Sequence, residues 1–342
     1  MGKDNEAHWI GFDLGGTKML AVVYDSEFKK LGKARKKTKG REGMQAGLKR
    51  INSVIKEALE DAKISADQVH GLGIGCPGPL DLKKRRIRMA PNLGWKDVPI
   101  AESIEKEFGF PVTIANDVDA GVFGEYSFGA GQKARCVVGI FPGTGVGGGC
   151  VYEGKLFRGS NCTCMEIGHI PILPAGRLDG AGNSGSLEGL ASRLSIASDA
   201  AGAAYRGQAP NLLEDAGTDL SDIRSGALAN SVKKGDKAVE KIIEKACDHL
   251  ASSVVTIVHL LAPDVIVFGG GLIEAMPDVL LPRIEKSAKK RILPSMVDVF
   301  EIKEAKLGDD AGVMGAAALA KQSVEGSVEG SAEGSAEGSK KG

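Results

Sequence analysis

Two glycine-rich turns, each directly after an apolar run of β type, most constrain how this chain can fold. The first lies in residues 10–18, IGFDLGGTK, and the second in residues 137–149, VVGIFPGTGVGGG. Glycine lacks a Cβ atom, so consecutive amides can converge on an anion and a phosphate oxygen can approach the backbone closely. Asn116 and Asp117 stand between the two turns in the sequence. The pattern predicts one polyphosphate bound from both sides with an acid beside it, the plan of a kinase cleft.

Length and charge narrow the class of protein. A chain of 342 residues exceeds what one core usually organises, so we expect two domains with a crevice that suits a small ligand. The 44 basic and 44 acidic residues cancel, which favours neither nucleic acid nor a membrane as partner. No apolar run is long enough to cross a bilayer, and the N-terminus lacks a signal-peptide core. We expect a soluble, cytoplasmic protein whose six cysteines are reduced.

The N-terminal part of the chain alternates strand and helix signals, which is typical of an α/β fold. Leu48, Ile51, Ile55 and Leu59 recur at spacings of three and four, so they predict an amphipathic helix over residues 44–62. We expect strands over residues 9–13, 19–24, 29–37, 69–75 and 111–115, and further helices over residues 99–108 and 116–126.

The C-terminal part loosely repeats this scheme. We expect strands over residues 135–141, 149–152, 155–157 and 264–268, a helix over residues 237–261, and an Ala-rich helix over residues 309–321 that returns to the first domain. These elements predict a small domain of residues 1–117 plus 309–321 and a large domain of residues 118–308. Residues 322–342 form a repeat of Ser, Glu, Gly and one small residue, which lacks apolar surface to offset ordering entropy and is expected to be disordered.

With these features in view, the chain resembles the ROK family of sugar kinases and sugar-responsive repressors. The resemblance implies a two-domain α/β fold of the actin-like ATPase (ribonuclease H-like) type with a ligand cleft between the domains. It also implies phosphorylation of a hexose or amino-hexose hydroxyl by ATP and Mg²⁺, in a homodimer. The motifs that carry it, in the order of the family, are DLGGTK (13–18), PGPLD (77–81), NLGW (92–95), ANDVDAGVFGE (115–125), GTGVGGG (143–149), EIGH (166–169), PDVIVFGGG (263–271) and GDDAGVMGAA (308–317).

Asp117 is the candidate general base. A sugar hydroxyl that attacks a γ-phosphoryl group must lose its proton to a group within hydrogen-bond reach, and a carboxylate is sufficient. An aspartate at a helix start is by itself more often a cap. The neighbouring Asn116 and the two glycine turns favour the catalytic interpretation.

Three glycine turns are assigned to the nucleotide. Asp13, at the end of the first strand, is expected to hold Mg²⁺ through water, although the turn after it is also a good hairpin loop in its own right. The predicted nucleotide contacts are Asp13, Gly15, Gly16, Thr17 and Lys18 in the first turn, Gly143, Thr144, Gly145, Gly147 and Gly148 in the second, and Gly269, Gly270 and Gly271, which would flank the adenosine at a helix N-terminus.

The resemblance also implies a set of sugar contacts. In the family, Glu166, His169 and Glu188 clasp the sugar hydroxyls together with Asn116 and Asp117. Carboxylates accept two hydroxyl hydrogen bonds each, so they suit an uncharged polyol. Taken singly, Glu188 is also typical of a first-turn helix acid and His169 of a satisfied buried histidine. Gly78 and Asn92, in two presumed sugar-loop motifs, complete the set.

One departure from the family concerns zinc. Many relatives carry a structural zinc held by the equivalent of His169 and three cysteines in a CxCGxxGC pattern, but residues 179–186 here read DGAGNSGS. Asp, Ala and Ser cannot reproduce the thiolate set, so we predict no zinc site and a His169 oriented by hydrogen bonds. Cys162 and Cys164 could be displaced ligands with His169, yet a tetrahedral site would still lack one ligand.

These observations predict an ATP-dependent hexokinase, with glucose as the preferred substrate and Asp117 accepting the proton of the 6-hydroxyl. N-acetylmannosamine, N-acetylglucosamine, fructose or mannose would fit the same chemistry. The basic run at residues 83–86 leaves polyphosphate open as a donor. A sugar-sensing repressor is the rival class, and it is disfavoured because the first strand is expected within ten residues of Met1, which leaves no room for a helix-turn-helix.

Overall fold

The computed structural model describes residues 7–160 and 164–338, with side chains as far as residue 326. Its contacts divide the chain into two units, which are described separately. Unit 1 comprises Met1–Ser127 and Asp309–Gly342, and unit 2 comprises Phe128–Gly308. The sequence places the first domain boundary ten residues earlier, at 117/118. The later boundary arises because helix α3 (Asp117–Phe128) packs on helix α11 (Ala311–Gly338) of unit 1.

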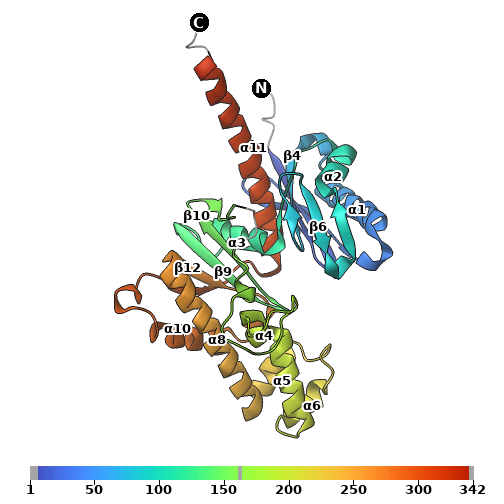
Figure 1. The fold of residues 1–342 in the computed structure, drawn as a ribbon. Helices are drawn as coiled ribbons and strands as arrows, with labels where there is room; N and C mark the ends of the chain where they lie inside the picture. The colour runs from blue at the N-terminus through green and yellow to red at the C-terminus, as the bar shows by residue number, and fades with distance from the viewer. Residues whose placement is uncertain (1–6, 161–163, 339–342) are drawn as a thin grey trace. The chain divides into compact units, whose positions relative to one another are not determined.

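Unit 1 is built on a five-stranded sheet of order β3-β2-β1-β4-β8 (Figure 1). The first three strands are antiparallel neighbours, whereas β4 and β8 run parallel to β1 and therefore need helical crossovers. The crossover helices are α1 (Met44–Ala62) and α2 (Ile100–Phe108). The strands are β1 (His8–Leu14), β2 (Lys18–Tyr24), β3 (Lys30–Lys37), β4 (Val69–Cys76) and β8 (Val112–Asn116), close to the predicted ranges.

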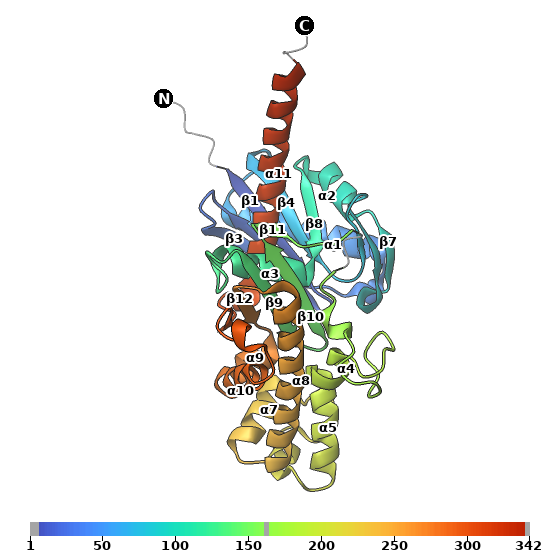
Figure 2. The same ribbon diagram turned by 60° about the vertical axis from the view of Figure 1, so that its left-hand side comes forward.

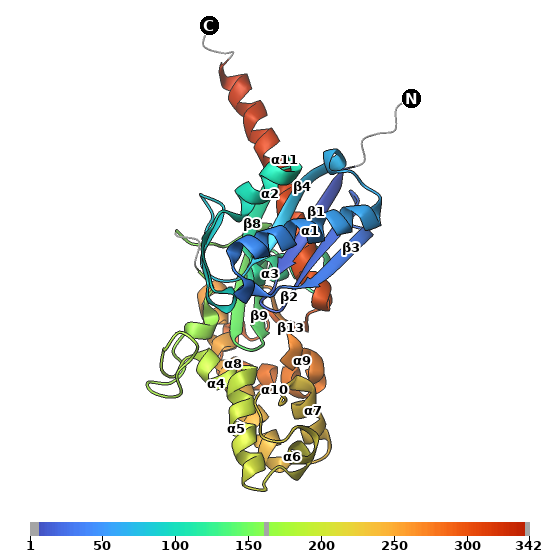
Figure 3. The ribbon, with the colours of Figure 1, turned by 90° about the vertical axis from the view of Figure 1, so that its right-hand side faces the viewer.

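Helices cover the two faces of this sheet, and the alternation of side chains along the strands decides which residues meet which helix. Ile10 and Phe12 of β1 belong to the core cluster that includes α1 and α2. Trp9 of β1 belongs instead to the cluster that includes Val313 and Ala317 of α11. Figure 3 shows α1 and α2 on one side of the sheet, with α11 behind it.

The sequence did not predict a small second sheet in unit 1, between β4 and α2. Its strands, in spatial order, are β5 (Leu80–Asp81), β6 (Arg86–Ala90) and β7 (Trp95–Val98). The basic run at residues 83–86 forms the turn between β5 and the start of β6. The 3₁₀ helix η3 (Pro91–Leu93) connects β6 to β7, and the indole of Trp95 donates a hydrogen bond to the Gly40 carbonyl at 3.1 Å.

Helix α11 is longer than the sequence predicts. It begins at Ala311, as expected for the Ala-rich segment, but continues to Gly338 through the repeat that was expected to be disordered. Once a helix is nucleated, each added residue gains one hydrogen bond, so a formed helix can extend into a segment of low propensity. The repeat is rich in glycine and serine, and disorder of this segment in solution stays a prediction.

Unit 2 repeats the mixed sheet, with order β11-β10-β9-β12-β13. Strands β9, β10 and β11 are antiparallel, and β12 and β13 run parallel to β9. This is the internal echo of unit 1 that the sequence predicts, with β13 as an unpredicted edge strand. The bounds are β9 (Cys136–Pro142), β10 (Val146–Tyr152), β11 (Lys155–Leu156), β12 (Val265–Phe268) and β13 (Glu301–Glu304).

The helices of unit 2 pack on the apolar face of a long amphipathic helix, α8 (Lys237–Leu261), which ends before Pro263 as predicted. Figure 2 shows α8 alongside its neighbours, and its apolar residues form one core with theirs. The sequence predicted a helix start at Glu188, which is α4, but not the short helices between residues 193 and 233. The remaining helices are α4 (Leu187–Ala191), α5 (Arg193–Tyr205), α6 (Pro210–Ala216), α7 (Ser225–Lys233), α9 (Gly271–Ala275) and α10 (Pro277–Lys289). Within the described residues, every helix is too short or too polar to span a membrane.

Helices α3 and α11 approach each other at glycine. A Cβ atom added at Gly124 would lie 2.3 Å from the Ala311 carbonyl oxygen, and one added at Gly315 would lie 1.8 Å from the carbonyl oxygen of Ala120. Both contacts are with backbone, which cannot rotate away. The close approach fixes α3, and with it Asp117, against the sheet of unit 1.

A matched pair of substitutions in α3 tests this contact. We expect Gly124→Ala to lower the free energy of unfolding by about 1–3 kcal/mol, because the new methyl group overpacks against backbone. A Cβ at Gly121, one turn earlier, would meet no atom within 4 Å, so Gly121→Ala should raise the free energy of unfolding by up to about 1 kcal/mol through helix propensity. Urea unfolding of both variants is the measurement, and equal effects of the two substitutions would contradict the close contact.

Candidate active site

In unit 1 the predicted acids lie at the carboxyl ends of two parallel strands, β1 and β8, on either side of β4. Asp13 of β1 pairs in register with Gly75 of β4, and a Cβ added at Gly75 would lie 3.4 Å from the Cα atom of Asp117. Burial raises the pKa of Asp13 to about 6, and the negative charge of Asp117 adds to the shift. The structure therefore brings Asp13 and Asp117 together, in a place where carboxylate charge is poorly solvated.

The capping role at the start of α3 belongs to Asn116. Its side-chain oxygen accepts hydrogen bonds from the backbone amides of Val118 at 2.9 Å and Asp119 at 3.4 Å. Asp117 is the first residue of the helix, and one of its oxygens accepts from the amide of Val118 at 3.0 Å. The sequence left open whether Asp117 acts as a cap. Asn116 supplies the cap, and Asp117 is left beside Asp13.

Thr38 holds the first glycine turn through two hydrogen bonds. The Thr38 hydroxyl donates to the Gly15 carbonyl at 2.6 Å, and the Thr38 amide donates to the Thr17 carbonyl at 2.8 Å. Gly16, Thr17 and Lys18 are exposed, and Lys18 forms an ion pair with Asp309 at 3.0 Å. The tip of the turn is thus exposed, and the Lys18 ammonium is already paired with a carboxylate of the same unit.

The two presumed sugar-loop residues of unit 1 lie near this turn. Asn92 is an exposed residue of η3, and its Cβ atom would lie 3.6 Å from a Cβ added at Gly16. Gly78 has a φ of +80°, and a Cβ atom there would lie 2.1 Å from the Met89 carbonyl oxygen, so only glycine fits. The small sheet β5-β6-β7 therefore holds Asn92 beside the first glycine turn.

In unit 2 the second glycine turn joins β9 to β10. Arg193, which the sequence analysis did not single out, holds it: the Arg193 amide donates to the Gly143 carbonyl at 2.8 Å and its guanidinium donates to the Thr144 hydroxyl at 3.1 Å. The Gly143 amide donates to the Gly145 carbonyl within the turn. Gly147 and Gly148 lie in strand β10 rather than in the turn.

Glu188 lies directly against this turn. Its carboxylate accepts hydrogen bonds from the amides of Val146 and Gly180, both at 3.0 Å. A Cβ atom at Gly145 would lie 2.2 Å from a Glu188 oxygen, so a side chain at this point would displace the carboxylate from its present place. One carboxylate thus joins the second glycine turn to the loop that begins at residue 179.

The other two predicted sugar residues lie at the two ends of the 3₁₀ helix η4 (Ile167–His169): Glu166 precedes it and His169 is its last residue. Glu166 is exposed at its start. The His169 Nδ1 atom lies 2.7 Å from an oxygen of Asp179. Desolvation disfavours the charged ring, but the hydrogen bond to Asp179 and the nearby carboxylates raise the pKa of His169 above its ordinary value. Sequence reasoning predicted that hydrogen bonds would orient His169, and it missed Asp179 as the partner because no motif marks it.

The residues present do not fit the family's zinc site. Within the part of the chain that the structure describes, His169, Asp179 and Glu188 form the one acid and histidine cluster whose possible ligand atoms all lie within 4.8 Å of one another. Both carboxylates already accept hydrogen bonds from N–H or O–H groups, and the three thiolates are absent. Cys164 hydrogen-bonds through its Sγ atom to the Phe157 carbonyl at 2.5 Å, and Cys162 lies outside the described residues.

The third glycine turn connects β12 to α9. Gly269 is required by packing, because a Cβ atom there would lie 2.4 Å from the ring of Phe141, and Gly270 has a φ of +82°. A Cβ atom at Gly271 would lie 3.6 Å from the Ser225 hydroxyl oxygen. The turn therefore abuts the start of α7.

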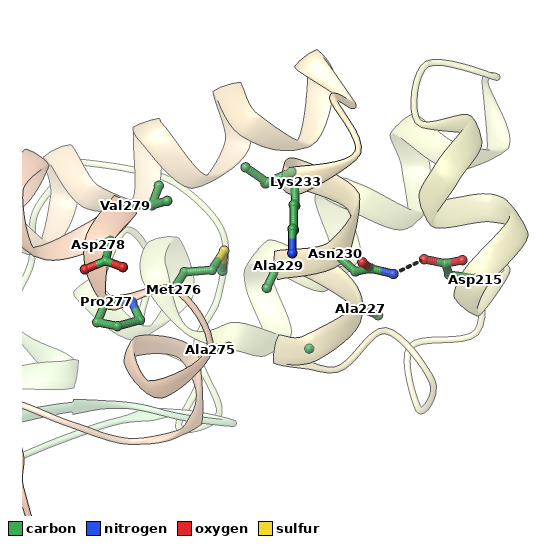
Figure 4. A pocket seen from close by; sticks show the side chains of 12 residues that line it. Asp215, Ala227, Ala229, Asn230, Lys233, Ala275, Met276, Pro277, Asp278 and Val279 are labelled. Carbon is green, nitrogen blue, oxygen red and sulfur yellow. Dashed lines mark hydrogen bonds between the residues drawn. The ribbon is translucent and has the colours of Figure 1, made fainter.

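Beside this turn lies a cavity of about 840 Å³ that the sequence did not reveal. Its walls are helix α7, from Gly226 onwards, and the junction of α9 and α10 around Met276 and Pro277 (Figure 4). Asn230 and Asp215, joined by a hydrogen bond of 2.5 Å, lie at one end of it in Figure 4.

The comparisons with known proteins identify the family. Residues 9–323 match the ROK family, and the chain belongs to it. A glucokinase of Thermotoga maritima is 30% identical over 318 residues, which cover 93% of this chain and 98% of the relative. A ROK family glucokinase from Streptomyces griseus, solved with glucose and AMPPNP, has a TM-score of 0.78 at 29% identity and covers 92% of this chain and 99% of that one.

The family also contains regulators. A ROK family transcriptional regulator, described as a homolog of the Escherichia coli MLC protein, has a TM-score of 0.81 at 25% identity, covering 93% of this chain and 78% of that one. The predicted family and fold class are confirmed: the chain has the actin-like ATPase fold of the ROK kinases.

The substitution Asp13→Asn tests two effects of the Asp13 charge: its effect on the free energy of unfolding and its effect on activity. The folded state raises the pKa of Asp13 from 3.8 to about 6, so it holds this proton more tightly than the unfolded state does. Ionisation therefore destabilises the fold progressively as pH rises from about 4 to about 6, and the penalty persists above that range.

Without divalent cations, we expect Asp13→Asn to raise the free energy of unfolding at pH 7.5 by up to about 3 kcal/mol, and to change it little at pH 4. The same substitution should abolish sugar phosphorylation. Urea unfolding at the two pH values is the measurement. A gain of equal size at both would show that the Asp13 charge is not the cause.

Proposed function

We propose that this chain is an ATP-dependent glucokinase that converts glucose to glucose 6-phosphate. The observation that carries the proposal is the presence of Asp117 at the start of α3, beside Asp13, in a chain that aligns with glucokinases over nearly its whole length. Their identities to this chain are 30% or 31%. The Streptomyces griseus enzyme, with glucose and the ATP analogue AMPPNP, supports both substrates.

In this mechanism Asp117 is the catalytic base. It accepts the proton of the glucose 6-hydroxyl as the oxygen attacks the γ-phosphorus of ATP. The new bond joins sugar oxygen and phosphorus, the bond between the γ-phosphorus and the β–γ bridging oxygen breaks, and ADP leaves. Because the Asp117 oxygen accepts a hydrogen bond from the Val118 amide, the carboxylate is held in one orientation.

Asp13 is the residue proposed to hold Mg²⁺ through water. The fit rests on its environment: a mostly buried carboxylate with a second acid beside it, where a divalent cation would relieve unfavourable charge. When bound, Mg²⁺ would neutralise charge on the triphosphate. The exposed tip of the first turn, Gly16 and Thr17, and the second turn around Thr144 would supply phosphate contacts.

We assign the adenosine end of ATP to the third glycine turn and the cavity beside it. Gly271 lies next to Ser225, and the cavity wall begins at the following residue, Gly226. A cavity of about 840 Å³ exceeds the needs of one purine, so only part of it would be filled.

Glu166, His169, Glu188, Asn92 and Asn116 are proposed to bind the sugar hydroxyls. Each offers an oxygen or nitrogen that can accept a hydrogen bond from a hydroxyl, which suits a neutral polyol. The same contacts could serve fructose, mannose or an N-acetylhexosamine, and the glucokinase relatives favour glucose. We also propose a homodimer, as expected from the family, and ATP rather than polyphosphate as the donor.

A regulator is the second candidate, because ROK repressors align with this chain as well. The putative xylose repressor of Caldicellulosiruptor is 26% identical, below the identity of the glucokinases. The acid pair Asp13 and Asp117 favours phosphoryl transfer, since a sugar sensor needs no base. Sequence-specific DNA binding in a gel-shift assay, without sugar-dependent ADP release, would favour the regulator.

The decisive test couples ADP release to a screen of hexoses and N-acetylhexosamines, with and without Mg²⁺. We expect glucose to give the highest kcat/KM and Asp117→Asn to lower kcat on the order of a hundredfold or more. Asp119→Asn, in the same helical turn, is the matched control and should keep near-normal activity. Near-normal glucose-dependent ADP release by the Asp117 variant would refute the mechanism.

A further inference from the structure

We propose that Asp179 is the positioning residue of the sugar site and does with hydrogen bonds what a structural zinc does in many relatives. This inference rests on the proposed sugar-kinase function. Its starting point is the misfit described above: the zinc-binding pattern is missing, yet the loop of residues 170–187 is closely organised. The amide of Leu187 donates to the Ile170 carbonyl at 3.0 Å and that of Ile172 to the Gly185 carbonyl at 2.9 Å.

The Asp179 side chain is fully buried, and it is the centre of this loop. One oxygen accepts from His169 Nδ1 at 2.7 Å, from the Ser186 hydroxyl at 2.8 Å and from the Asn183 side-chain amide at 3.2 Å. The other oxygen accepts from the backbone amides of Ala181 at 2.9 Å and Asn183 at 2.8 Å. Five donors converge on one carboxylate, which is the way a buried anion is stabilised without a metal.

The first consequence concerns His169. An ionised carboxylate only accepts hydrogen bonds, so the hydrogen between the two side chains is on Nδ1 of the ring. The neutral ring then carries its free lone pair on Nε2, which can accept a hydrogen bond from a sugar hydroxyl. Asp179 thus selects the tautomer as well as the orientation of His169.

The second consequence concerns Glu188. Ser186 is the N-cap of α4, the short helix that carries Glu188, and its hydroxyl oxygen accepts from the Gly189 amide at 3.3 Å while donating to Asp179. The amide of Gly180, the residue after Asp179, donates to the Glu188 carboxylate. Asp179 therefore fixes both sugar-binding side chains, one through η4 and the other through the cap of α4.

Bound zinc is the competing explanation, because His169, Asp179 and Glu188 could also present ligand atoms to one ion. The hydrogen bonds argue against it. A metal between these groups would displace the Ser186 hydroxyl, the Gly180 amide and the His169 hydrogen from the carboxylate oxygens they now contact. The two explanations differ in metal content and in which ring nitrogen of His169 carries the hydrogen.

The wild-type protein supplies the first test. We expect elemental analysis of protein purified without chelator to find well under one zinc per chain, and we expect EDTA followed by excess Mg²⁺ to leave the glucose KM unchanged. In ¹⁵N NMR, assigned with His169→Gln, neutral His169 should carry its hydrogen on Nδ1. Stoichiometric zinc whose removal raises the glucose KM, or a hydrogen on Nε2 alone, would overturn the proposal.

The second test is Asp179→Asn, which keeps the shape of the side chain but puts an amide where His169 and Ser186 now donate. We expect the glucose KM to rise on the order of 10-fold to 100-fold, with the ATP KM within about twofold of wild type. The His169 tautomer should also become mixed. Asp219→Asn is the matched control, because Asp219 is an exposed aspartate that accepts a backbone hydrogen bond, from Ser221 at 2.8 Å, in another loop.

The outcomes separate this inference from the proposed function. An unchanged glucose KM in a folded Asp179→Asn variant, while Asp117→Asn is inactive, would reject the positioning role and leave the kinase intact. If no sugar is phosphorylated by the wild type, the proposed function fails, and the tautomer and zinc measurements still decide what orients His169. If Asp179→Asn does not fold, these two measurements on the wild type decide the inference.

Discussion

The close crossing of helices α3 and α11 at glycine is the constraint on which the placement of Asp117 beside Asp13 in unit 1 depends. Backbone meets backbone at Gly124 and Gly315, with no side chain between the helices to adjust. The crossing fixes the start of α3 over the carboxyl ends of β1 and β4, and this is why Asp117 lies near Asp13 although the two are far apart in the sequence. The Ala-rich segment that follows Gly308 is thus part of the site's architecture, because it anchors the helix that carries Asp117, the proposed base.

Two buried aspartates show opposite solutions to the same physical problem. For Asp13, desolvation and the like charge of Asp117 outweigh the nearby cations Lys18 and Arg35 and raise its pKa to about 6. Asp179 is also desolvated, but hydrogen bonds from His169, Ser186 and Asn183 outweigh the desolvation and lower its pKa below the usual range. An uncompensated acid is suited to receive a cation with its substrate, whereas a fully compensated one is suited to hold its neighbours in place.

The sequence predicted the strands of both sheets except β13, and the long helices α1, α8 and α11, because glycine turns, apolar runs and amphipathic or Ala-rich stretches mark them locally. It missed the small sheet β5-β6-β7 and the short helices α5 to α7, whose signals are weak and whose existence depends on packing. In the site, the sequence pointed to Asp117 and His169, but not to Arg193 or Asp179. These two act through contacts with the second glycine turn and with His169, and no spacing in the chain encodes a contact that only the folded loop creates.

The Asp179 network also indicates what a sugar site requires of its support. A zinc with thiolates and a hydrogen-bonded carboxylate both close a loop around a histidine. Each binds one ring nitrogen and thereby fixes whether the other ring nitrogen carries a hydrogen. The Asp179 carboxylate does so with five hydrogen bonds, which need no metal and no reduced thiols. The cost is that each donor must be in place, so the loop must be glycine-rich enough to turn sharply: Gly182 and Gly185 have φ values of +89° and +69°. Both glycines stand where the CxCGxxGC pattern also has glycine, so the loop keeps the same turns and only the ligands differ: Asp179 and its donors take the place of the metal and its thiolates.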